Sequence, residues 1–215
     1  MNKTLCTRSL TVLGVALAVV LLGTVAVAQP PFPDTFYVNY YSNAQTAGLP
    51  DGGVWIDNPG NDHYLPLCAM IYVFDNYQEM SECCGCYESH NDLDYLSINT
   101  DLTSNPLTGV PLTSGVFKIV SSTVNALAPV LCDPTSNVTP TQDLTAWGTH
   151  IQNNGTTIAG APFYPTTETS FSSPTLSAEE LAALQAQCSF IYILGSGHGL
   201  CTCGSGSYAP KKKKK

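Results

Sequence analysis

Leu67-Cys68-Ala69-Met70-Ile71-Tyr72-Val73-Phe74 is the most apolar stretch of the chain outside its N-terminal segment. An apolar run of this length is typical of a fully buried strand, and Val, Ile, Tyr and Phe all favour extended backbone. The run therefore predicts the central strand of a sheet, with Cys68 inside it. Any sheet built around this strand needs further strands on both of its sides.

Shorter β-favouring segments supply them, separated by turns rich in Gly, Pro, Asn and Asp. In two of these segments the apolar residues alternate: Leu96 and Ile98 share one face, and Phe117 and Ile119 lie opposite Lys118. Many short strands between turn signals predict a mainly β, antiparallel, sandwich-like domain. The expected strands are 36–41, 54–56, 95–99, 116–124, 130–132, 144–152 and 167–172.

Two short helices are expected beside the strands. Asp75 can cap a helix near 76–84, with Gln78 placed three residues on to reach back to the cap. The second helix, near 178–191, should dock on the sheet. Ser177 is its expected N-cap and Glu180 completes a capping box. Leu176 can staple onto the first residue of an apolar stripe formed by Leu181, Leu184, Cys188 and Ile191.

The N-terminus has the features of an export signal. Lys3 and Arg8 precede an uncharged apolar run over 10–28 that ends in Ala26-Val27-Ala28, which predicts cleavage between Ala28 and Gln29. A retained membrane anchor is the alternative, because the run approaches the length that spans a bilayer. The expected organisation is a signal peptide over 1–28, one disulfide-stabilised β domain over 29–204, and a flexible tail over 205–215.

Eight cysteines follow the signal, and an even number in an exported chain predicts a disulfide framework. They are Cys68, Cys83, Cys84, Cys86, Cys132, Cys188, Cys201 and Cys203. Three of them cluster at 83–86, where Gly85 would let the backbone turn tightly. The C-terminal Cys-Thr-Cys pair is a natural partner for this cluster. Two alternatives are a metal site formed with His90 and a redox Cys-x-x-Cys motif, which lacks its usual βαβ setting.

The charge is unevenly distributed. Residues 29–210 contain sixteen acidic residues and one basic residue, Lys118. Such a body has almost nothing to neutralise phosphates, which excludes nucleic acid as a partner. The five lysines at 211–215 are typical of an interaction tail, one that would contact an anionic envelope surface or an acidic neighbour, or of an added tag.

The acidic residues concentrate in loops, and the loop around residues 92–101 offers the best oxygen ligands for Ca²⁺. Asp92, Asp94 and Asp101 are the candidates, although turn capping also explains Asp residues in such places. No other cofactor is expected. The four histidines after the signal, at 63, 90, 150 and 198, are scattered and suggest isolated positions more than a shared metal site.

Much of 67–204 resembles a group of cysteine-rich exported bacterial proteins without assigned function. The similar stretches are 67–75, 78–86, 102–106, 147–152 and 194–197 leading into Cys201 and Cys203. The resemblance implies a shared secreted fold and carries no known activity.

These observations favour a non-catalytic protein, exported to the extracellular space, periplasm or cell surface, that serves in surface structure, adhesion or ligand binding. Its partner would be a glycan or a surface protein, with contact area from tyrosines such as Tyr37, Tyr40, Tyr41 and Tyr64. The alternative is a secreted hydrolase that uses loop carboxylates, with or without Ca²⁺. A hydrolase should gather Asp92, Asp94 or Asp101 beside a histidine in a concave site.

Overall fold

The computed structural model describes residues 34–60, 65–104, 106, 108–127 and 132–194. Strands are the main regular structure in this part of the chain, which also contains one α-helix and one five-residue π-helix. The elements are β1 (Phe36–Ser42), β2 (Gly53–Asp57), β3 (Leu67–Asp75), β4 (Met80–Glu88), β5 (Leu93–Ser97), η1 (Ile98–Leu102), β6 (Ser114–Thr123), β7 (Thr145–Ile151), β8 (Thr157–Ile158), β9 (Ala161–Pro162), β10 (Thr166–Ser170) and α2 (Ala178–Leu194).

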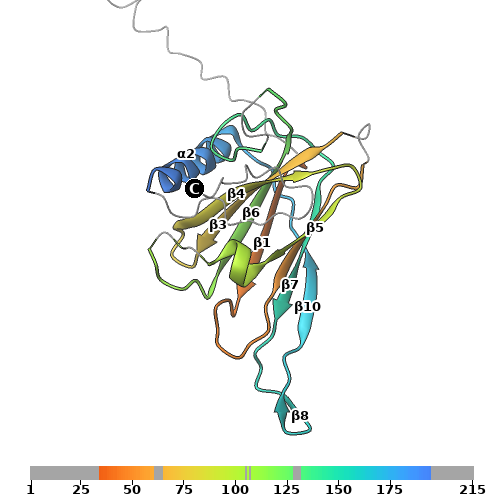
Figure 1. Cartoon of the computed structure of the whole chain (residues 1–215), viewed down its shortest axis with the longest axis vertical. Helices are drawn as coiled ribbons and strands as arrows, with labels where there is room; N and C mark the ends of the chain where they lie inside the picture. The colour runs from red at the N-terminus through yellow and green to blue at the C-terminus, as the bar shows by residue number, and fades with distance from the viewer. Residues whose placement is uncertain (1–33, 61–64, 105, 107, 128–131, 195–215) are drawn as a thin grey trace, which may run out of the picture.

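The strands form two antiparallel four-stranded sheets (Figure 1). The first sheet has the order β1-β6-β3-β4, and the second has the order β10-β7-β2-β5. β8 and β9 make a small separate hairpin. Side chains from both sheets meet in one apolar core, so the prediction of a mainly β, sandwich-like domain is confirmed.

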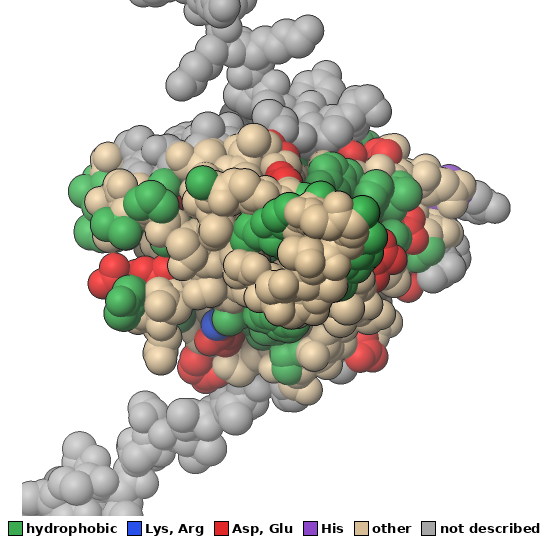
Figure 2. Space-filling model, turned by 90° about the horizontal axis from the view of Figure 1, so that it is seen from below, with side chains coloured by type: hydrophobic (Ala, Val, Ile, Leu, Met, Phe, Trp, Pro, Cys, Tyr) green, Lys and Arg blue, Asp and Glu red, His purple; other side chains and the backbone are tan. Residues whose placement is uncertain are grey.

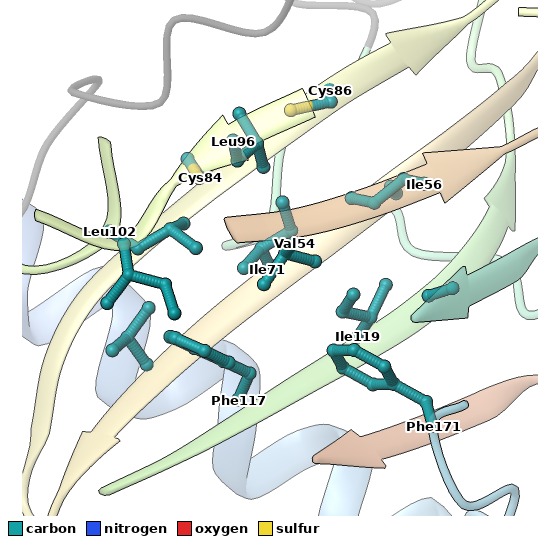
Figure 3. Close-up of a cluster of buried hydrophobic side chains, with 14 of the residues drawn as sticks. Val54, Ile56, Ile71, Cys84, Cys86, Leu96, Leu102, Phe117, Ile119 and Phe171 are labelled. Atoms are coloured by element: carbon teal, nitrogen blue, oxygen red, sulfur yellow. The ribbon is translucent and has the colours of Figure 1, made fainter. Parts of the chain in front are cut away.

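The β3 strand is central in the first sheet, between β6 and β4, and its alternate residues face two different apolar layers. Leu67, Ala69, Ile71 and Val73 belong to the core between the sheets, part of which Figure 3 shows. Cys68, Met70, Tyr72 and Phe74 belong to a second core, which also contains the buried stripe of α2. Because both faces of β3 are covered, the strand is apolar at every position instead of every second one.

The α2 helix begins where the capping pattern predicted. Ser177 Oγ accepts a hydrogen bond from Glu180 N at 3.1 Å, and the predicted stripe is the buried one: Leu181, Leu184, Cys188 and Ile191. The Glu180 carboxylate does not return to the cap. It pairs instead with Lys118 Nζ on β6 at 2.6 Å, which ties the start of the helix to the first sheet.

The helix predicted near 76–84 is wrong, because this segment turns and enters β4 at Met80. Asp75 Oδ1 accepts hydrogen bonds from Tyr77 N at 2.8 Å and Glu79 N at 2.9 Å, much as it would at a helix N-cap. Gln78 then adopts a left-handed backbone with φ of 70°, which reverses the chain into a hairpin. The capping interaction is real, but it closes a turn.

Gly85 also has a different role from the predicted one. It lies inside β4, paired with Met70, and not at a turn. A Cβ at this position would lie 2.1 Å from the carbonyl oxygen of Cys132. Glycine is required because the chain at Cys132 passes directly over the strand. Cys132 itself lies in a bend, and residues 130–131 of the strand expected there lie outside the described residues.

Three further boundaries differ. The strand expected over 95–99 ends at Ser97, whose hydroxyl accepts from Thr100 N at 2.9 Å and caps η1. The β8–β9 hairpin was not predicted, and β10 ends at Ser170. The other predicted strands match β1, β2, β3, β6 and β7 within a few residues.

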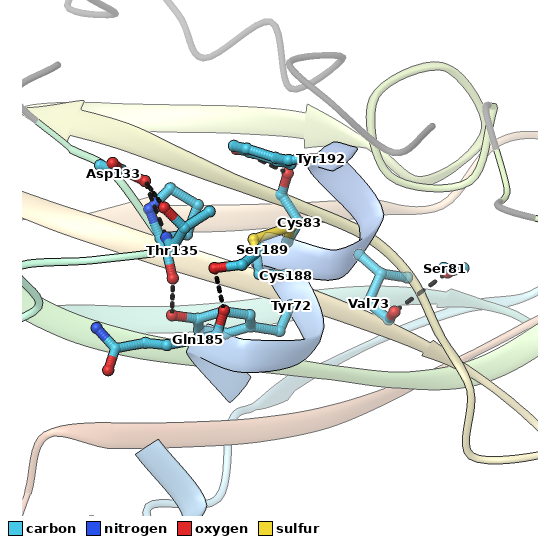
Figure 4. The surroundings of a disulfide bond; sticks show 11 residues. Tyr72, Val73, Ser81, Cys83, Asp133, Thr135, Gln185, Cys188, Ser189 and Tyr192 are labelled. Carbon is cyan, nitrogen blue, oxygen red and sulfur yellow. Dashed lines mark hydrogen bonds between the residues drawn. A yellow bond between two sulfur atoms is a disulfide. The ribbon is translucent and has the colours of Figure 1, made fainter. Parts of the chain in front are cut away.

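Disulfides join the layers. Cys68 on β3 is bonded to Cys132, and Cys83 on β4 is bonded to Cys188 on α2 (Figure 4). Cys84 and Cys86 are also disulfide-bonded. These six cysteines are therefore structural, and thiolate chemistry at the 83–86 cluster does not fit. Cys201, Cys203, Ala28 and Gln29 lie outside the described residues.

Bridges of this kind suit an oxidising, extracytoplasmic compartment. Within the described ranges, no helix combines the length and the hydropathy needed to cross a bilayer.

Candidate functional site

Three aromatic side chains form a row across the outer face of the second sheet. Trp55 on β2 is in register with Tyr95 on β5 and with Trp147 on β7. The ring centroids of Trp55 and Tyr95 are 4.7 Å apart, and those of Trp55 and Trp147 are 6.3 Å apart with planes 14° from parallel. We call Tyr95, Trp55 and Trp147 the aromatic strip.

The strip lies on a face that solvent reaches. Tyr95 is 43% exposed, and both tryptophans are partly exposed. The first sheet, by contrast, has its outer face against the stripe of α2. Large aromatic side chains gathered in contact with solvent are more typical of a contact surface than of a structural role.

The Tyr95 ring occupies space that is free because residue 53 is a glycine. Gly53 on β2 is paired with Ser97, two residues beyond Tyr95, and a Cβ at Gly53 would lie 2.1 Å from Tyr95 Cε2. The ring therefore packs directly on the backbone of β2, and its hydroxyl donates to Gly52 O at 3.5 Å. Since the ring is already held by the sheet, little conformational entropy is lost when a ligand covers it.

Hydroxyls and carboxylates flank the strip on the same face. Asp57 lies two residues beyond Trp55 and accepts from Thr145 Oγ1 at 3.4 Å. Thr149 follows Trp147 by two residues and is paired with Glu168 on β10. At the β5 end, Ser97 donates to Asp51. Lys118, the only Lys or Arg between residues 34 and 194, lies on the other sheet, so the surround of the strip is polar and acidic.

A second feature lies at one end of the sandwich interior. Glu88 is the last residue of β4 and is 0% exposed, and Asp94 on β5 is 3% exposed. One oxygen from each carboxylate and the Cys86 sulfur lie within 4.8 Å of one another. We call Glu88 and Asp94 the buried acidic pair.

Neither carboxylate oxygen of Glu88 has a hydrogen-bond partner among the described residues. Burial is the main cause that raises the pKa of Glu88, and together with the negative charges of Asp94, Asp92 and Asp57 it brings this pKa to about 9. A carboxyl group with this pKa keeps its proton at neutral pH. Such a group is unusual in a structural core, where buried polar atoms normally have partners.

The three predicted calcium ligands do not come together as a set. Asp92 closes the turn before β5, accepting from Ser89 N at 3.1 Å and Ser89 Oγ at 2.8 Å. Asp101 accepts from Ser97 N at 2.8 Å beside η1. Asp94 belongs to the buried acidic pair. Its partner Glu88 was missed because the helix expected over 76–84 hid the strand that carries it.

The predicted tyrosine contacts also separate. Tyr41 is buried in the core, and Tyr37 is partly buried against it. Tyr40 is 48% exposed and stacks on His150 with ring centroids 4.1 Å apart. Tyr64 lies outside the described residues. The aromatic strip is instead formed by Tyr95 and by two partly exposed tryptophans, none of which was predicted as a contact residue.

The two described histidines lie apart. His90 packs on Gly60, which has φ of 69°. His150 is 2% exposed, has its Nε2 2.7 Å from Thr169 Oγ1, and has its pKa lowered by burial. Within the described ranges, neither histidine joins the group of candidate metal ligands around Glu88. His63 and His198 lie outside those ranges.

No protein-family model, curated protein or solved structure significantly matches this chain.

Proposed function

We propose that this chain is an exported, non-catalytic binding protein and that the aromatic strip on its second sheet binds a neutral glycan. The observation that carries the proposal is the row of Tyr95, Trp55 and Trp147 on a solvent-reached sheet face. Export is supported by the disulfides, which need an oxidising compartment.

The chemistry of the surface favours a sugar. The C–H groups on one side of a pyranose ring carry a slight positive charge, and the faces of aromatic rings carry a negative quadrupole, so the two pack together. Sugar hydroxyls can then donate to carboxylates such as Asp57 and exchange hydrogen bonds with hydroxyls such as Thr149. Rings from three adjacent strands form a row that can follow consecutive sugar residues.

Charge argues against anionic ligands. The face drawn in Figure 2 shows acidic side chains in several places and blue in only one small area. Lys118, the single basic residue of the described chain, is paired with Glu180 at 2.6 Å. Among the residues that the structure describes, an anionic polysaccharide would find carboxylates and no Lys or Arg beside the strip.

The same geometry supports a hydrolase less well than it supports a glycan-binding protein. Its catalytic carboxylates must reach a substrate bound in a cleft. Glu88 and Asp94, two carboxylates that lie close together, are buried inside the sandwich. The aromatic strip lies on the outer face, so these carboxylates do not face a ligand bound there.

The test is to measure the binding of neutral oligosaccharides to the oxidised protein by tryptophan fluorescence and calorimetry. The panel contains cello-, malto-, xylo- and manno-oligosaccharides, with polygalacturonate as the anionic probe. Trp55→Ala should weaken binding at least about tenfold, equal to about 1.4 kcal/mol. Tyr95→Ala, which changes a 43% exposed residue, should do the same with less effect on folding.

Tyr77→Ala is the matched control, because Tyr77 is an 80% exposed aromatic residue on the β3–β4 turn. It should bind as the wild type does. The proposal fails if no neutral oligosaccharide binds, if polygalacturonate binds more tightly than all of them, or if both strip variants bind unchanged.

A further inference from the structure

The buried acidic pair is built by two neighbouring segments that both direct a carboxylate inward. Glu88 is aligned with Leu67 across the β3–β4 ladder, and Leu67 belongs to the core between the sheets. Asp94 precedes Tyr95, so strand alternation turns it inward on the side of Leu96. The two carboxylates therefore meet inside the sandwich, where water is largely excluded.

Within the described residues, no Lys or Arg side chain lies beside Glu88 to balance a negative charge there. Lys118 is the only Lys or Arg between residues 34 and 194, and it pairs with Glu180 on the far side of the first sheet. Both oxygens of Glu88 lack hydrogen-bond partners within the described residues, although the residue is 0% exposed. An ionised carboxylate in such a position is costly, so Glu88 must either keep its proton or share its charge with a bound cation.

The two carboxylates lie close enough for one metal ion to contact both. Ca²⁺ binds carboxylate oxygens at about 2.3–2.6 Å, so two ligands on opposite sides of the ion are separated by about 5 Å. One oxygen of Glu88 and one oxygen of Asp94 are at most 4.8 Å apart, which is compatible with this arrangement. An ion between them would supply a partner to the oxygens of Glu88 that have none.

The ligand atoms select the type of metal. Cys86 is the third member of the group, but its sulfur is already in a disulfide and offers no thiolate. The carboxylate oxygens that remain prefer hard cations over zinc or copper. Calcium accepts irregular coordination and gives up its water readily, whereas magnesium keeps several waters and needs a regular octahedron.

We propose that Glu88 and Asp94 bind one Ca²⁺ ion at the end of the sandwich, joining the last residue of β4 to β5. This site does not depend on the aromatic strip, since the pair faces the interior and the strip faces solvent. The ion would hold together the two sheets, because β4 belongs to the first and β5 to the second.

The experiment uses the full-length oxidised protein, freed of metal with a chelator and titrated with Ca²⁺ in a calorimeter. The expected result is one Ca²⁺ per chain and a melting temperature that rises with Ca²⁺ concentration. Glu88→Gln should lower the Ca²⁺ affinity at least about tenfold, since it removes one charged ligand of a pair. The amide has nearly the shape of the carboxyl group, so the variant should fold.

Glu82→Gln is the matched control. Glu82 lies on the same strand, is 3% exposed and precedes Glu88 by six residues. It should leave the Ca²⁺ affinity unchanged. The proposal is overturned if the metal-free protein binds no Ca²⁺ at millimolar concentration, if Glu88→Gln binds as tightly as the wild type, or if Mg²⁺ or Zn²⁺ binds more tightly than Ca²⁺.

Discussion

A methyl group added at Gly85 should destabilise the fold strongly. The new Cβ of Gly85→Ala would lie 2.1 Å from the carbonyl oxygen of Cys132, whereas ordinary contact begins at 3.4 Å. The Cys132 segment must therefore move by more than an ångström. It is held by the bond to Cys68 and by a 2.9 Å hydrogen bond from Tyr72 Oη to Pro134 O, so it cannot move independently.

The expected cost is at the upper end of overpacking effects, about 3 kcal/mol. For a chain of this size that corresponds to a fall in melting temperature of about 6–12 °C. Gly148→Ala is the matched control, because Gly148 also lies inside a strand but the tightest contact of its Cβ would be with the Asn39 side-chain nitrogen, at 3.0 Å. That side chain can shift, so the control should lose less than about 1 kcal/mol.

Urea unfolding of the oxidised proteins measures both values, with the slope compared to check two-state behaviour. A second measurement repeats Gly85→Ala in a Cys68→Ala/Cys132→Ala background. Releasing Cys132 should reduce the cost of the added methyl by at least about 1 kcal/mol, which appears as a coupling energy. The reasoning is refuted if Gly85→Ala costs no more than Gly148→Ala, or if its cost is the same with and without the disulfide.

Three further predictions concern other parts of the fold. Leu184→Ala on α2 should lower the free energy of unfolding by about 2–5 kcal/mol, because Leu184 is 1% exposed. Ile193→Ala on the same helix should change it by no more than about 0.5 kcal/mol, because Ile193 is 81% exposed. Thermal and urea unfolding of the two variants measure both values. Because burial lowers the pKa of His150, the unfolded chain takes up a proton at a higher pH than the folded protein does. The contribution of His150 to stability should therefore be full above about pH 6.5 and should fall as the pH decreases below it. The variant His150→Gln should flatten that part of a curve of unfolding free energy against pH. Lys118→Gln should cost at most about 1 kcal/mol, with an effect that shrinks in high salt, because its pair with Glu180 is partly exposed; a loss of several kcal/mol at high salt would contradict this.

Local signals were enough to predict most of the elements. The apolar run of β3 and the capping residue Ser177 each depend on neighbours within a few positions, and both predictions are confirmed. The β4 strand was missed for a local reason as well. Asp75 makes the hydrogen bonds expected of a helix cap, and only the left-handed backbone at Gln78 turns the same contacts into a hairpin.

Non-local pairing explains what the sequence could not show. Trp55, Tyr95 and Trp147 are far apart in the chain and become neighbours through the register of three strands. The requirement for glycine at position 85 comes from Cys132, a residue far along the chain. Glu88 is the last residue of β4, a strand that was not predicted, whereas Asp94 was assigned to the acidic loop around residues 92–101. The loop was therefore evaluated without Glu88, the most deeply buried acidic residue.

The two candidate sites are adjacent in sequence and separate in space, which makes them distinguishable by experiment. On β5, Asp94 points into the sandwich and Tyr95 points out of it, so consecutive residues serve different sites on opposite faces of the second sheet. A change at Glu88 acts on the interior and should leave glycan binding by the strip in place. A change at Trp55 acts on the outer face and should leave Ca²⁺ binding in place. Loss of both activities in either variant would indicate general unfolding, because only the backbone of the sheet is common to the two sites.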